Sequence, residues 1–134
     1  MNKIGVFIVD HHEIFREGLR RILEEEEDVQ VLAALADGEE AVRRAKELLP
    51  DVILISVDIP NVNSIEIVKK IKTACPSTAV ITLSSYHHGQ HVVASMRAGA
   101  AGYLLNVAPV TELIKAIHVV RKGGKVFDSS AVTD

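Results

Sequence analysis

Short apolar runs alternate with longer amphipathic stretches along this chain of 134 residues, and the alternation limits the folds that are possible. Five runs are rich in β-branched residues and have the length of strands: Ile4–Val9, Val29–Ala34, Val52–Ile55, Ala79–Leu83 and Ala101–Leu105. Strands that are apolar on both faces are typical of parallel sheets with helices on either side. The pattern therefore predicts buried strands within an α/β fold.

Apolar residues recur at helical spacing in the stretches between these runs. The first helix is expected from Ile14 to Leu23, because the acidic run that follows opposes the helix dipole. A second helix, capped by Asp37, is expected to end at Leu48, since Pro50 cannot continue it.

Three further helices are expected, over residues 63–74, 87–98 and 109–122. Asn63 and Glu66 have capping-box spacing at the start of the first of these, and Gly99 ends the second. Pro109 is expected at the first helical position of the third, which ends at Gly123. Five strands alternating with five helices predict a doubly wound parallel sheet with right-handed crossovers.

Ligands of doubly wound sheets bind at the carboxyl ends of the strands, beside the point where the strand order reverses. Polar residues follow four of the predicted strands: Asp10–His12, Ser56–Asp58, Ser84–Ser85 and Asn106. We therefore expect the chemistry of this protein at these positions.

Composition excludes several partners and compartments. Fifteen Lys and Arg against 18 Asp and Glu give a net charge of −3, whereas nucleic-acid-binding domains are normally basic, so we expect no direct contact with nucleic acid. The apolar runs are too short to span a membrane. The lone Cys75 permits no disulfide framework, and the chain start lacks the build of a signal peptide, so we expect a cytoplasmic protein.

Two common enzyme signatures are missing from the sequence. A dinucleotide-binding domain needs a glycine-rich turn after the first strand, where this chain has Asp10–Glu13. A serine hydrolase would place Ser56 in a Gly-x-Ser-x-Gly elbow, but its neighbours are Ile55 and Val57. We therefore expect the protein not to be an enzyme.

Four motifs carry a resemblance to a known family, and they lie at residues 9–19, 37–41, 50–54 and 97–105. With them the chain resembles, over nearly its whole length, the receiver domain of bacterial response regulators, in particular the NarL/FixJ (LuxR-type) transcription regulators. The resemblance implies a two-component phosphorelay protein with a flavodoxin-like (βα)5 fold and the strand order 2-1-3-4-5.

In this family a histidine kinase supplies a phosphoryl group to an Asp at the end of the third strand. The transfer uses Mg²⁺, an acidic pair after the first strand, a hydroxyl after the fourth strand and a Lys after the fifth. By resemblance, Asp10 matches the first acid, Ser84 the hydroxyl, and Tyr103 the aromatic residue that moves with it.

The other parts of that machinery are replaced. His11 stands at the position of the second acid, and Asn106 at that of the Lys. Counting four residues back from Pro60 places Ser56 at the acceptor position. We therefore expect a degenerate pocket without Asp phosphorylation, with weakened Mg²⁺ binding and no resident cofactor, and a histidine kinase is a doubtful partner.

Several alternatives stay open. Asp58 could be a relocated acceptor, and Ser56 could carry a phosphoserine ester made by a different enzyme. The altered pocket could instead sense a metal ion, a proton or a small ligand, with Asp10, His11 and Asp58 as candidate metal ligands. A pair at helical spacing, His87 and His91, is a further metal candidate.

The resemblance also implies a domain organisation and partners. Residues 1–124 form the receiver-like regulatory domain, and residues 125–134 resemble the start of a linker toward a helix-turn-helix output domain outside this chain. In the family, the surfaces of the fourth helix, fifth strand and fifth helix, or of the first and fifth helices, make dimer and interdomain contacts. We therefore expect a homodimer that controls transcription through its own or a partner's DNA-binding domain.

Overall fold

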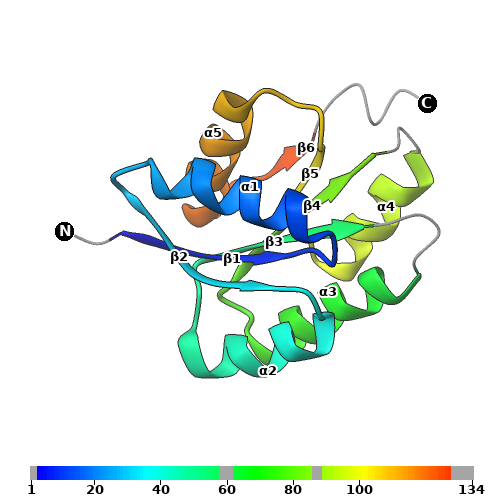
Figure 1. The fold of residues 1–134 in the computed structure, drawn as a ribbon. Helices are drawn as coiled ribbons and strands as arrows, with labels where there is room; N and C mark the ends of the chain where they lie inside the picture. Colours follow the sequence, from blue (N-terminus) through cyan, green and yellow to red (C-terminus); the bar gives the residue numbers. More distant parts are fainter. Residues whose placement is uncertain (1–2, 58–61, 86–88, 128–134) are drawn as a thin grey trace.

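Parallel strands form the centre of the protein, which the computed structural model describes for residues 3–57, 62–85 and 89–127 (Figure 1). They build one sheet in the order β2-β1-β3-β4-β5-β6, and every pair of neighbours is parallel. The strands are β1 (Ile4–Val9), β2 (Val29–Leu35), β3 (Val52–Val57), β4 (Ala79–Ser84), β5 (Gly102–Leu105) and β6 (Val126–Phe127). The flavodoxin-like order predicted for the first five strands is confirmed.

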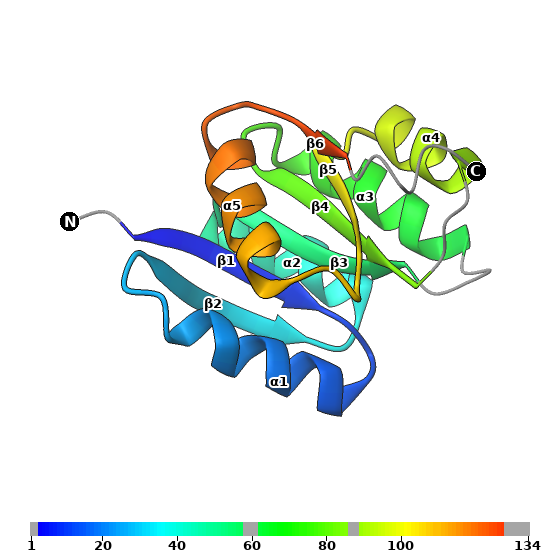
Figure 2. The same ribbon diagram turned by 90° about the horizontal axis from the view of Figure 1, so that it is seen from above.

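Helices cover both faces of this sheet. They are α1 (Glu13–Glu24), α2 (Gly38–Leu48), α3 (Val62–Ala74), α4 (Gly89–Ala98) and α5 (Val110–Arg121). Figure 2 shows α1 and α5 on one side of the strands and α2, α3 and α4 on the other. In the described part of the chain, no helix is both long and apolar enough to cross a membrane.

Each face of the sheet has its own core, because successive side chains of a strand point in opposite directions. Val6 of β1 belongs to the same core as Leu23 of α1 and Ile117 of α5. Its neighbour Phe7 belongs to the opposite core, with Val68 of α3. All five side chains are fully buried, and burying one aliphatic side chain of this size contributes about 1.5–3 kcal/mol. The strands are thus held from both sides, which fixes where their carboxyl ends lie.

Two predicted helix ends agree with the structure. Asp37 caps α2, where its carboxylate accepts a hydrogen bond from the backbone N–H of Glu39 at 3.3 Å. Gly99 follows α4 with a φ of +108°, a conformation that glycine adopts without the clash that a Cβ would cause. A Cβ at this position would also stand 2.9 Å from Cγ of Lys72.

Two predicted helix starts are wrong. Helix α3 begins at Val62, so Asn63 lies inside it and not at the position before its first residue. Pro109 is the N-cap of α5 and not its first helical residue. In both cases the helical spacing of apolar residues is right but leaves the first residue undetermined, since a helix can begin one position to either side of a favourable capping residue.

Strand β6 is the element that the sequence did not predict. Val126 pairs with Gly102, and Phe127 pairs with Tyr103, inside the segment expected to begin a linker. Phe127 also packs against the buried pair of Val92 and Tyr103. Two residues are too few to show a period, so this strand has no signal in the sequence.

Candidate functional site

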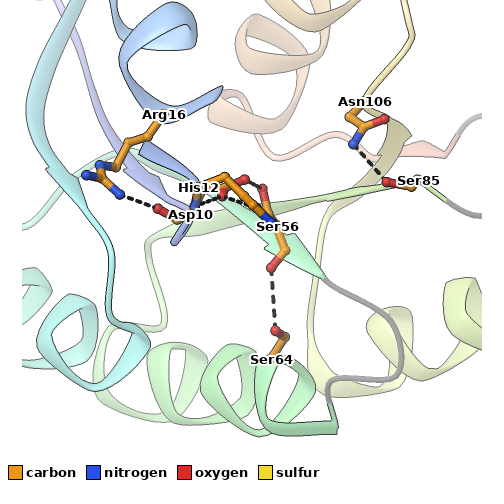
Figure 3. A network of polar contacts seen from close by, with 7 residues as sticks. All are labelled: Asp10, His12, Arg16, Ser56, Ser64, Ser85 and Asn106. Carbon is orange, nitrogen blue, oxygen red and sulfur yellow. Dashed lines mark hydrogen bonds and ion pairs between the residues drawn. The ribbon is translucent and has the colours of Figure 1, made fainter. Parts of the chain in front are cut away.

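Asp10 lies at the carboxyl end of β1 and is the centre of a polar network (Figure 3). Its side chain is only 5% exposed. Its Oδ1 accepts hydrogen bonds from the backbone N–H of His12 at 2.6 Å and faces Nδ1 of His12 at 3.0 Å. Its own backbone N–H donates to the carbonyl of Leu35 at 2.9 Å. The carboxylate is therefore held in one orientation by the loop that follows it.

Ser56 meets this carboxylate from the neighbouring strand. Because β1 and β3 pair with Val9 opposite Ile55, the next residues, Asp10 and Ser56, lie side by side. The Ser56 hydroxyl donates a hydrogen bond to Oδ2 of Asp10. The Ser64 hydroxyl of α3 donates a long one, 3.4 Å, to the Ser56 carbonyl. The sequence-based expectation that these strand ends converge is thus met for Asp10 and Ser56.

Arg16 is a site residue that the sequence analysis did not single out. From the first turns of α1 its Nη1 donates to the backbone carbonyl of Asp10 at 2.7 Å. The contact ties α1 to the end of β1. Its only signal in the sequence is its place six residues after Asp10, on the helix that follows the strand.

Ser84 and Tyr103 form a second polar pair, on β4 and β5. Both side chains are buried, and Tyr103 is completely so. Burial raises the pKa of Tyr103 above its usual value, and a hydrogen bond between its side chain and Ser84 opposes this shift. The pair predicted as switch hydroxyl and aromatic residue is therefore in contact.

Asn106, after β5, is hydrogen-bonded to Ser85. Its side-chain Nδ2 donates to the Ser85 hydroxyl at 3.1 Å, and the two lie apart from the other labelled residues in Figure 3. Its backbone N–H donates to the Ser84 carbonyl at 2.9 Å. The sequence predicts that Asn106 is near the pocket, and the structure places it at the same sheet edge but bonded to Ser85.

The exposed imidazoles of His11 and His12 follow the buried Asp10 directly in the chain. The rings of His11 and His12 have centroids 4.1 Å apart. One ligand atom from each of Asp10, His11 and His12 lies within 4.8 Å of the others. Of the other predicted metal candidates, His91 lies in α4, whereas Asp58 and His87 fall outside the described residues.

A groove of about 480 Å³ opens beside this network, between the ends of β1 and β3 and the first turns of α2 and α3. Asp10, His11 and Ser56 line it. Lys70 and Glu39 also line it, and their charged groups pair at 2.8 Å. The groove can therefore admit water and small ions to the Asp10 carboxylate.

The donor set does not fit the Mg²⁺ ion that the resemblance implies. Mg²⁺ takes oxygen ligands in near-ideal octahedral geometry and relies on carboxylates to bind it. His11 offers an imidazole nitrogen in place of the carboxylate that the resemblance implies, so Asp10 is the only one of Asp10, His11 and His12 that carries a carboxylate. Within the described part of this cluster, Asp10 would thus have to bind Mg²⁺ without a second carboxylate beside it.

Comparison with known proteins decides the family. The sequence profile of the response regulator receiver domain matches residues 6–118. This chain belongs to that family. The receiver domain is similar to the transcriptional regulatory protein DegU of Brevibacillus brevis, with 39% identity over 92% of this chain and 52% of DegU. It thus spans about half the length of the curated relatives it matches.

Solved structures agree with this assignment. A LuxR-family two-component response regulator from Aurantimonas sp. SI85-9A1 superposes on the receiver domain with a TM-score of 0.89 and 26% identity, covering 97% of this chain and 93% of the other. RcsB, solved as two dimers bound to two parallel DNAs, has a TM-score of 0.83 and 26% identity, covering 97% of this chain and 66% of RcsB. The receiver domain therefore shares the fold of a LuxR-family response regulator, and its relative DegU is a transcriptional regulatory protein.

Proposed function

We propose that this receiver domain controls transcription through dimer or interdomain contacts and without phosphorylation of an aspartate. The observation that carries the proposal is the contact between Ser56 and Asp10. Where the family holds its acceptor carboxylate, this chain has a hydroxyl that donates to the remaining acid. A serine hydroxyl at this place cannot form an acyl phosphate, because that bond needs a carboxylate oxygen.

The rest of the pocket supports the proposal. An incoming phosphoryl group brings negative charge, which the family offsets with a metal ion and a Lys. In this chain Asn106 offers a neutral amide, and that amide is bonded to Ser85. The Mg²⁺ donor set is incomplete as well. Ser84 and Tyr103 already form a buried, hydrogen-bonded pair, so their arrangement needs no phosphoryl group to hold it.

Acetyl phosphate tests the absence of phosphorylation. The chain is incubated with acetyl phosphate and Mg²⁺, and its intact mass is measured before and after hydroxylamine, which cleaves acyl phosphates. We expect no gain of a phosphoryl group. The positive control is the triple variant His11→Asp, Ser56→Asp, Asn106→Lys, which restores the family's residues. A hydroxylamine-sensitive phosphoryl group on the unaltered chain would refute the proposal and would point to Asp58 or another carboxylate.

Contact surfaces are available on the helices that the family uses. An apolar groove of about 300 Å³ lies between α1 and α5, and Phe15, Leu19 and Leu113 line it. Ile14, at one end of it, is 91% exposed. RcsB, a relative in fold, forms dimers on DNA. We therefore propose that a second copy of this chain covers the groove. Dimerisation would then control a DNA-binding output domain, which belongs to this protein or to a partner.

Light scattering on the purified chain tests the dimer. Ile14→Glu places a charge on the groove, whereas Leu49→Glu places one at the end of α2, where Leu49 is also largely exposed. We expect a dimer for the unaltered chain and for Leu49→Glu, and a monomer for Ile14→Glu. A monomeric unaltered chain, or a dimer that survives Ile14→Glu, would contradict the proposed surface.

The proposal places the protein in the cytoplasm and assigns DNA contact to another domain. The single free thiol, Cys75, suits a reducing compartment. The net charge of −3 suits a regulatory domain that leaves nucleic acid to a basic partner.

A further inference from the structure

We infer that Asp10, His11 and His12 form a binding site for a divalent ion of the zinc class, namely Zn²⁺, Co²⁺ or Ni²⁺. The ligand atoms of these three residues lie within 4.8 Å of one another at the mouth of the sheet. The inference rests on the proposed function, because a working phosphorylation pocket would hold Mg²⁺ at the same place.

The geometry of the Asp10–His12 contact is close to that of two metal ligands. Oδ1 of Asp10 and Nδ1 of His12 are 3.0 Å apart. With bonds of about 2.0–2.1 Å, two ligands of a tetrahedral Zn²⁺ ion stand about 3.3 Å apart. An ion can therefore replace the hydrogen bond between these atoms if they separate by only a few tenths of an ångström.

His11 supplies the third ligand. One of its ring nitrogens lies within 4.8 Å of the ligand atoms of Asp10 and His12, and its side chain is exposed. Three protein ligands and one water complete a tetrahedral shell, the arrangement of zinc sites that keep an open position. The exposed side of both imidazoles leaves a path for the ion from solvent.

The buried carboxylate is oriented before any ion arrives. The Ser56 hydroxyl donates to Oδ2, and the backbone N–H of His12 donates to Oδ1. Arg16 and Leu35 hold the backbone of Asp10 through its carbonyl and its N–H. Hydrogen bonds that fix a ligand's orientation strengthen metal binding, and removing one typically costs 10–100-fold in affinity.

The donor set also selects the ion. Two imidazoles and one carboxylate suit Zn²⁺, Co²⁺ and Ni²⁺, which accept nitrogen ligands readily, whereas Mg²⁺ requires oxygen ligands. His11 in place of an acidic residue therefore weakens the binding of Mg²⁺ and favours the binding of zinc-class ions.

Calorimetric titration with ZnCl₂ tests the site, with CoCl₂ absorption spectra as a second readout of tetrahedral nitrogen coordination. We expect one ion per chain, no displacement by millimolar Mg²⁺, and loss of binding in His11→Gln and in His12→Gln. Ser56→Ala is expected to retain the site with affinity weakened about 10–100-fold. Thermal unfolding of each variant without metal confirms that it is folded.

His118→Gln is the matched control. His118 is a half-exposed histidine paired with Asp28 at 3.0 Å, next to the amino end of β2 and so at the opposite edge of the sheet from Asp10. We expect this variant to bind zinc like the unaltered chain. The inference is overturned if the folded unaltered chain binds no zinc, if His11→Gln and His12→Gln bind as tightly as His118→Gln, or if Mg²⁺ displaces the ion. A phosphoryl adduct in the acetyl phosphate experiment would refute the proposed function separately, since the zinc titration contains no phosphoryl donor.

Discussion

Replacing Ser56 by Asp restores the family's acceptor carboxylate but places it against a buried acid. In the structure the Ser56 hydroxyl donates to Oδ2 of Asp10, whose side chain is 5% exposed. Ser56→Asp exchanges this donor for a second negative charge at the same contact. Because Asn106 is neutral and its amide is bonded to Ser85, no Lys offsets the new charge.

The cost follows from the charges and from the pH. Two carboxylates about 4 Å apart repel by about 4 kcal/mol at an effective dielectric constant of about 20. The folded variant can avoid this repulsion by binding one proton. Protonating a carboxyl group at pH 7, roughly three units above its ordinary pKa, costs about 1.36 kcal/mol per unit, again about 4 kcal/mol. We therefore expect Ser56→Asp to lose about 4 kcal/mol at pH 7, out of the roughly 5–15 kcal/mol typical of a domain.

Urea unfolding at several pH values measures this loss. At pH 7 the midpoint of Ser56→Asp is expected to fall by more than about 1 M. In the variant the folded state holds a proton that the unfolded state releases above about pH 4, so its stability decreases as the pH rises toward 7. The deficit is therefore expected to shrink to about 1 kcal/mol near pH 5, where one carboxyl protonates at low cost.

Ser56→Asn provides the control of equal size. Its amide carries no charge and can donate to Oδ2 of Asp10, so we expect a loss of about 1 kcal/mol that does not change with pH. The reasoning is refuted if both variants have the same midpoint at pH 7. It is also refuted if the deficit of Ser56→Asp is constant between pH 5 and pH 8.

Three further predictions concern the backbone, a buried hydroxyl and the last strand. Leu49 has a φ of +49°, so Leu49→Gly is expected to raise the free energy of unfolding by up to about 1 kcal/mol. Leu48 lies within helix α2, so Leu48→Gly is expected to lower it by about 1 kcal/mol. Equal effects of the two variants in urea unfolding would contradict this. Burial raises the pKa of Tyr103, so the unfolded chain releases this proton first and stability falls above about pH 10; Tyr103→Phe should lack that fall, and an unchanged alkaline profile would exclude Tyr103 as its source. Phe127→Ala removes the side chain that packs on Tyr103, so the amides of β6 are expected to exchange faster with solvent while those of β1 keep their protection, and slow exchange in β6 would show that backbone pairing alone holds it.

The fold was predictable where long segments repeat a clear period. The β-branched runs such as Ile4–Val9 and the helical spacing of residues 14–23 identify their elements without any neighbour. Helix starts were less predictable, as Asn63 and Pro109 show, because capping preferences are weak compared with packing of the apolar face. Strand β6 could not be predicted at all, since its pairing depends on a sheet edge that exists only after folding.

The site was predictable in position but not in its contacts. That Asp10 and Ser56 converge follows from the parallel sheet, whose strand ends meet at one edge. The direction of a side chain does not follow, so the bond from Asn106 to Ser85 could not be predicted. Arg16 was missed because a side chain that bonds to a backbone carbonyl leaves no pattern of residue types in the sequence.

The pairing of β6 restricts how partners can approach one side of the molecule. A free sheet edge offers a row of backbone groups to which another strand can add. Beside β5 that row is shortened, because Gly102 pairs with Val126 and Tyr103 pairs with Phe127. Among the residues that the structure describes, Leu104 and Leu105 are the part of β5 that lies beyond this pairing, too few for a stable added strand. A partner that approaches the described part of β5 from this side therefore meets few free backbone groups. Its specificity would depend on side chains, which differ between this chain and DegU at 39% identity.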